Sequence, residues 1–211
     1  MATGSTVDRI LDTAEVLFAQ KGFAETSLRA ITSKAGVNLA AVNYHFGSKE
    51  ALIQAVFQRF LDPFCDAMES QLTSLPAGRS PSLEDLLFLV SHTSVAAQQG
   101  DARRVAIFFR LSGLGYTQAQ GHLRRFLRDR YGKAFTVFLQ RLQQAVPDVS
   151  PMELFWRVHF ALGSTIFTLS GMDSLRAICK ADFGSDLQPG DVDKRLITFL
   201  AGGIRASLKA S

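Results

Sequence analysis

TSLRAITSKAGVNLAAVNYHFGSKEAL, residues 26–52, is the stretch of this 211-residue chain that decides its fold. The threonine and serine at its start can cap a first short helix. Gly36 can end that helix, because glycine readily adopts the left-handed backbone conformation. Asn38 can then cap a second helix of about two turns, residues 39–46. Gly47 ends this second helix, and the serine that follows can cap a third.

Two short helices joined by a glycine turn are typical of a helix-turn-helix, whose second helix enters the major groove of DNA. Asn43 can form two hydrogen bonds with adenine there, and the small side chain of Ala40 can approach a thymine methyl group. Hydroxyl groups, ammonium groups and free amides at helix ends suit phosphates. A helical hairpin without a DNA role has the same pattern, so that alternative stays open on these residues alone. The predicted DNA-binding residues are Thr26, Ser27, Arg29, Asn38, Leu39, Ala40, Asn43, Tyr44, His45 and Lys49.

A specific combination of residues extends this pattern: Gly22-Phe23, Thr26-Ser27, Ile31, Ala35-Gly36-Val37, Tyr44, Phe46 and Ser48-Lys49-Glu50-Ala51-Leu52. The combination resembles the DNA-binding head of the TetR family of bacterial transcriptional repressors and covers the first quarter of the chain. The sequence of residues 37–57 further resembles the fatty-acid-responsive PsrA-type branch of that family; it reads VNLAAVNYHFGSKEALIQAVF. Asn43 stands where the family usually has an aromatic residue, and Gly47 where it often has proline, which leaves the operator sequence open.

Helical patterns continue along the rest of the chain, and no stretch alternates as a strand does. The chain is therefore predicted to be all-α, with a three-helix DNA-binding domain at 1–52 and an effector-binding and dimerisation domain at 53–211. Pro63 is expected to kink the helix that begins after Gly47. Further helices are expected at 83–94, 103–114, 121–146, 152–170 and 191–209, with Gly113 and Gly115 ending the second of these and a loop at 171–190.

The last two of these helices are apolar on more than one side, which indicates burial against several neighbours. Gly202-Gly203 leaves the backbone of the final helix open to close approach. A deep monomer core is one explanation. A homodimer that buries both helices against their symmetry mates is the other, and the family resemblance implies that arrangement.

Phenylalanine is abundant, with 17 in the chain. Aromatic side chains at helical spacing are usually ordinary core, but together they can also line a long apolar pocket between helices. Such a pocket suits an acyl chain, and the PsrA-type resemblance implies a long-chain fatty acid or acyl-CoA as the effector. Another apolar effector, such as a drug or an aromatic compound, is the alternative. The predicted ligand-binding residues are Phe108, Phe109, Phe126, Phe138, Phe155, His159, Phe160 and Phe167.

Other classes of protein are less well supported. The four histidines lack metal-ligand spacing, and no nucleophile elbow, P-loop or dinucleotide fingerprint occurs, so we predict neither an enzyme nor a cofactor or metal site. No export signal or membrane-spanning apolar run is visible, which predicts a cytoplasmic protein with two reduced thiols. A helical adaptor or chaperone without an operator remains open, and DNA binding that responds to salt and ligand separates it from a regulator.

The distribution of charge is unexpected for a DNA-binding protein. The net charge is +4, but residues 1–52 hold five basic and five acidic side chains, whereas residues 103–141 hold nine basic side chains and one acid. Phosphate contacts need only a few well-placed cations and amides. We therefore place the DNA-binding site at the helix-turn-helix, although the net charge of residues 1–52 is zero. The basic cluster consists of Arg124, Arg125, Arg128, Arg130 and Lys133. Three roles stay open for it: a solvated helix face, a site for the anionic group of a ligand, and a surface that flanks the DNA.

Overall fold

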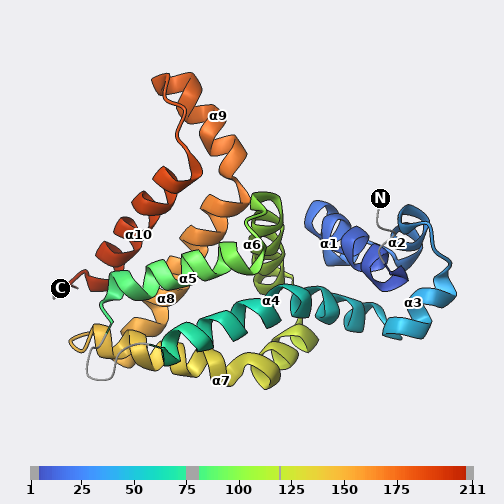
Figure 1. Cartoon of the computed structure of the whole chain (residues 1–211), viewed down its shortest axis with the longest axis horizontal. Helices are drawn as coiled ribbons and strands as arrows, with labels where there is room; N and C mark the ends of the chain where they lie inside the picture. Colours follow the sequence, from blue (N-terminus) through green and yellow to red (C-terminus); the bar gives the residue numbers. More distant parts are fainter. Residues whose placement is uncertain (1–4, 75–80, 119, 208–211) are drawn as a thin grey trace.

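The computed structural model describes residues 5–74, 81–118 and 120–207, and in these ranges every regular element is an α-helix, which confirms the all-α prediction (Figure 1). Residues 75–80, which include Pro76 and Gly78, and the predicted end of the last helix at residue 209 lie outside these ranges. The helices are α1 (Thr6–Glu25), α2 (Leu28–Ala35), α3 (Leu39–Phe46), α4 (Lys49–Thr73), α5 (Leu83–Ala97), α6 (Ala102–Thr117), α7 (Gly121–Ala145), α8 (Pro151–Ser170), α9 (Met172–Phe183) and α10 (Pro189–Arg205).

The N-terminal head consists of α1, α2 and α3 packed around a small apolar core. Ile10, Ala14 and Phe18 recur on one side of α1 and are fully buried, as the spacing of apolar residues predicts. They meet Ile31 of α2 and Val42 of α3 in the same cluster. Three short or medium helices thus hold one another in place, although α2 and α3 are too short to be stable alone.

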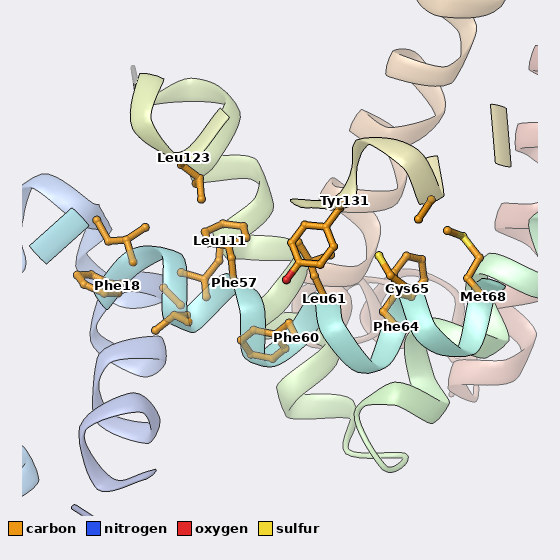
Figure 2. Packing of buried hydrophobic residues seen from close by; sticks show 14 of the residues in the cluster. Phe18, Phe57, Phe60, Leu61, Phe64, Cys65, Met68, Leu111, Leu123 and Tyr131 are labelled. Carbon is orange, nitrogen blue, oxygen red and sulfur yellow. The ribbon is translucent and has the colours of Figure 1, made fainter. Parts of the chain in front are cut away.

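Helix α4 connects the head to the rest of the molecule. Its first half packs against α1, and its second half packs against α5 and α7. Figure 2 shows Phe57, Phe60, Phe64 and Met68 among the buried residues of α4, and the ring of Phe60 lies 5.4 Å from that of Phe108 of α6. The helix continues through Pro63, and the kink expected there stays a prediction. The predicted domain boundary at residue 52 falls within its first turn and stays a prediction.

Two predictions about the second half of the chain are wrong. Helix α6 does not end at Gly113 or Gly115 but continues to Thr117. A β-carbon at Gly113 would lie 3.0 Å from Ile166 of α8, and one at Gly115 would lie 3.3 Å from Leu123 of α7. These two glycines therefore allow close packing between helices instead of ending one, and spacing along the chain does not separate the two uses.

The predicted loop at 171–190 contains a helix, α9, which ends at Gly184 in the left-handed conformation (φ +65°). None of its residues is buried within the chain. It projects from the body together with the connection to α10 (Figure 1).

Three further observations bear on the sequence predictions. Among the described residues, no helix combines the length and hydrophobicity needed to cross a lipid bilayer. Both Cys65 and Cys179 are unpaired thiols. Burial raises the pKa of Cys65 to about 12, so this thiol is protonated and unreactive near neutral pH.

Candidate nucleic-acid interface

The angle between α2 and α3 is set by caps that the local sequence supplies. The Ser27 hydroxyl accepts a hydrogen bond from the backbone N–H of Ala30 at 3.1 Å. Gly36 ends α2 in the left-handed conformation (φ +65°). The Asn38 side-chain oxygen accepts from the N–H of Ala41 at 2.8 Å and so begins α3. Each cap satisfies a backbone group that a helix end leaves unpaired, so the predicted helix-turn-helix is confirmed in detail.

Helix α3 presents a nearly complete outer face to solvent. Val42 is its only buried residue and anchors it to the head. Ala40, Asn43 and Tyr44 are exposed and follow the i, i+3, i+4 spacing of one helix face, with Tyr44 at 86% exposure. A small side chain, an amide and a phenol on one accessible face are suited to reading base edges and phosphates in a major groove.

The structure brings most of the predicted DNA-binding residues to this one end of the molecule. The side chain of Leu39 is half-buried, and Asn38 already uses its oxygen as the α3 cap. The predicted residues that are exposed are Ser27, Arg29, Asn38, Ala40, Asn43, Tyr44 and His45.

Thr26 is a correction. Its side chain is completely buried, and its hydroxyl lies 2.8 Å from the carbonyl oxygen of Gly22 and 3.2 Å from that of Leu17. The hydroxyl therefore ties the end of α1 to the start of α2 and is not available to a phosphate. Gly22 interrupts α1 with φ +84°, and this break turns its carbonyl toward Thr26.

Lys49 has a mixed position at the start of α4. Its side chain is half-buried, and its ammonium donates a hydrogen bond to the carbonyl oxygen of Ala24 at 3.1 Å. An ammonium has three N–H donors, so two remain for a phosphate. Lys49 thus links the end of α1 to the start of α4 as well as offering a cation beside α3.

The acids of the head are mostly occupied away from the helix-turn-helix, which explains how a formally neutral head can meet DNA. Asp8 completes a capping box with Ser5, and Asp12 pairs with Arg59 of α4 at 2.5 Å. Among the described residues, Arg29 and Lys34 of α2 take part in no ion pair. The sum of charges along the sequence hides this separation.

Helix α6 holds the head at two points, and sequence reasoning missed both. Near its start, the guanidinium of Arg104 lies 3.8 Å from the buried carboxylate of Glu15 and also covers the ring of Phe60. Near its end, the side-chain oxygen of Gln118 accepts a hydrogen bond from the N–H of Phe23 at 3.0 Å. The partners are separated by 89 and 95 positions, so no local pattern could have revealed them.

Two family models match this chain. The model of the tetR family of bacterial regulatory proteins covers residues 10–56, and that of the tetracyclin repressor-like C-terminal domain covers residues 91–203, more than half of the chain. The chain belongs to the TetR family. The matching families and relatives are transcription regulators, not enzymes.

The relatives and solved structures agree with this placement. The chain is 35% identical over 86 residues to the probable HTH-type transcriptional regulator YttP of Bacillus subtilis, covering 41% of each chain. It is 32% identical over 108 residues to the HTH-type transcriptional repressor KstR2 of Mycolicibacterium smegmatis, covering 47% of this chain and 51% of that one. It therefore spans about half, or less, of the curated relatives it matches. The structure of the fatty acid degradation regulator FadR from Bacillus halodurans shares the fold, with a TM-score of 0.64 at 19% identity over 98% of this chain and 100% of that one.

The eight predicted ligand-binding residues differ in burial, and whether they bind a ligand stays a prediction. Phe109 is buried in α6, and the ring of its neighbour Phe108 lies 5.4 Å from that of Phe60. The side chain of His159 is half-buried, and its Nδ1 lies 2.7 Å from the carbonyl oxygen of Phe155. The α7 members are half-buried and most of the α8 members are exposed. The spacing of residues along a helix could not predict this, because it does not specify which face of the helix a neighbour covers. These members are Phe126 and Phe138 of α7, and Phe155, His159, Phe160 and Phe167 of α8.

The basic cluster is mostly a solvated face of α7. Arg130 is the exception, because its guanidinium makes two hydrogen bonds with the carboxylate of Asp62, at 3.0 and 3.1 Å. Tyr131 donates to the same carboxylate at 2.6 Å. These three residues fasten α7 to α4 next to Pro63. The exposed members are Arg124, Arg125, Arg128 and Lys133.

Proposed function

We propose that this chain is a DNA-binding repressor that acts as a homodimer on a palindromic operator. The observation that carries the DNA-binding part is the outer face of α3, where Ala40, Asn43 and Tyr44 are exposed and supported from behind by Val42. Capped ends on both short helices hold this face at a fixed angle. Two such heads related by a two-fold axis read two half-sites, spaced by about 34–36 Å or a multiple of it.

The homodimer is supported by an apolar face that one chain leaves uncovered. Phe167 of α8 is 69% exposed and Phe199 of α10 is 66% exposed, and both line a cleft of about 400 Å³ between these helices. Gly202 and Gly203 of α10 are exposed, with no atom within 4 Å of an added β-carbon. A second copy placed over α8 and α10 would bury these aromatic rings and approach the backbone closely at the glycines.

The proposed effector is a long-chain fatty acid. The proposal rests on the resemblance of residues 37–57 to the PsrA-type branch and on the phenylalanine content of the body. The FadR regulator from Bacillus halodurans has the same fold, which gives a precedent for the architecture. A ligand releases DNA only if it binds the non-DNA conformation better, so the acid must favour a different arrangement of the two heads.

A titration of labelled operator with saturated acids from C6 to C18 tests the effector by fluorescence polarisation. Each buried methylene contributes about 0.8 kcal/mol, so the affinity should rise about fourfold per carbon until the pocket is full. Long-chain acids should release the operator and short-chain acids should not. Parallel titrations with the matching acyl-CoA thioesters, on the wild type and on Arg124→Gln/Arg125→Gln, distinguish the free acid from the thioester. Failure of every chain length would end the lipid proposal and leave the repressor.

A further inference from the structure

A cleft of about 430 Å³ lies between α1 of the head and α6 of the body. Val16 and Ala19 of α1 form one wall, and Ala106 and Ile107 of α6 form the other. These small aliphatic side chains give the cleft an apolar floor. Its volume falls within the range of small-molecule sites, about 300–1,000 Å³.

Two guanidinium groups flank this floor. Arg103 and Arg110 of α6 both line the cleft. Seven residues along a helix correspond to nearly two turns and a rise of about 10 Å, so the two side chains leave the same face of α6. Among the described residues, neither side chain has an ion-pair or hydrogen-bond partner, whereas the neighbouring Arg104 is paired with Glu15.

We propose that this cleft binds a linear organic dianion, an α,ω-dicarboxylate of about eight carbons, whose extended length is close to the rise of about 10 Å between Arg103 and Arg110 along α6. Each guanidinium can form a two-pronged pair with one carboxylate, and the aliphatic chain between them covers the apolar floor. A fatty acid of the same length has only one carboxylate and would leave one arginine unpaired. This site goes beyond the proposed function and does not depend on the identity of the apolar effector.

The remaining polar residues of the cleft are compatible with a bound dicarboxylate, and one of them, Asp173, provides a test of the site. Gln20 and Ser170 are neutral and can donate hydrogen bonds to a carboxylate. Asp173, at the start of α9, is the one acid in the lining and repels an anion. Asp101, at the start of α6, already accepts hydrogen bonds from the backbone N–H groups of Arg103 and Arg104.

The position of the cleft also predicts a consequence for DNA binding. One wall belongs to α1, which is part of the head, and the other belongs to α6, which is part of the body. A dianion in the cleft contacts both and therefore favours one placement of the head relative to the body. Suberate at saturation should accordingly change the affinity of the protein for its operator.

Isothermal titration of the full chain with suberate, and with octanoate as the matched monoacid, tests the site at constant ionic strength. Suberate should bind once per chain and at least tenfold more tightly than octanoate. Arg103→Gln/Arg110→Gln should weaken suberate at least tenfold and bring it to the level of octanoate. Asp173→Asn should tighten it. All three positions are exposed, so the variants should fold normally.

The control is Arg124→Gln/Arg125→Gln, which removes the same charge from the exposed face of α7 and should leave suberate binding unchanged. Equal loss in both double variants would show that suberate responds to net charge, and equal binding of suberate and octanoate would show that the second arginine plays no part. Either result overturns the site. Binding of suberate without any change in operator affinity overturns the link to the head.

Discussion

The two ends of this molecule leave different kinds of side chain in solvent. Helix α3 in the head exposes Ala40, Asn43 and Tyr44, which are small or carry a polar group. Helices α8 and α10 in the body expose large rings, including Phe160 and Phe199. The exposed side chains of the head thus suit DNA, whereas the body leaves an apolar face that the proposed second copy would cover.

The largest expected effect comes from disrupting that apolar face. Phe199→Lys would place an ammonium in the proposed contact between two copies, where an unpaired charge is costly. The variant should be a monomer in sedimentation at micromolar concentration. Its affinity for a palindromic operator should fall about 10²- to 10⁴-fold, because the two heads are no longer linked.

A matched control for this variant is Leu139→Lys on α7. Leu139 is also an exposed apolar residue, at 41%, but α7 packs against α4 and α5 and lies outside the α8–α10 face. This variant should remain dimeric and keep its operator affinity. A wild-type protein that sediments as a monomer, or equal dissociation of both variants, would contradict the proposed homodimer.

The next effect concerns the head. Asn43→Ala should cost about 1–3 kcal/mol of operator binding and relax the base preference at one position. Lys49→Ala should instead weaken binding to all DNA sequences. It should also reduce the slope of the logarithm of the binding constant against the logarithm of the salt concentration by about one unit. Titrations of operator and random DNA at several salt concentrations measure both. Equal losses of specific and non-specific binding in the two variants would show that these roles are assigned wrongly.

The same contrast explains how far the sequence could predict the structure. Ser27, Gly36 and Asn38 were predictable because a cap depends on backbone groups only a few residues away. The burial of Thr26 was not, because it depends on where the end of α1 lies. The orientation of Phe160 and the packing role of Gly113 depend on neighbouring helices, which the spacing of apolar residues does not specify.

A smaller effect should separate Thr26 from its exposed neighbour. Thr26→Val keeps the shape but removes a buried hydroxyl, which should lower the free energy of unfolding by about 1–2 kcal/mol. It should leave the affinity for operator DNA unchanged. Urea unfolding measures the first quantity and operator titration the second. Ser27→Ala is the comparison, because it loses a helix cap worth about 1 kcal/mol and also a candidate phosphate contact. A loss of operator affinity in Thr26→Val as large as that in Ser27→Ala would restore Thr26 as a DNA contact.

The smallest effect is expected where the head and body share a buried charge. Glu15 is only 5% exposed, and burial raises its pKa above the ordinary value of 4.5, although Arg104 and then Arg59 partly offset this. Above about pH 4.5 the folded state therefore binds more protons at this site than the unfolded state does. The contribution of Glu15 to the free energy of unfolding is therefore fully present below about pH 4.5, and it is lost as the pH rises through the raised pKa of the folded state.

Glu15→Gln should remove the loss of stability that accompanies the ionisation of Glu15, because glutamine carries no titratable group. The free energy of unfolding of the variant, relative to the wild type, should increase as the pH rises from about 5 to about 8, and by less than the effects above, because the two arginines partly offset the cost of burial. Urea unfolding of both proteins across this range measures the difference. A relative stability that falls with rising pH would mean that the ion pairs with Arg104 and Arg59 outweigh burial. In that case the buried carboxylate would hold the head to the body more strongly as it ionises.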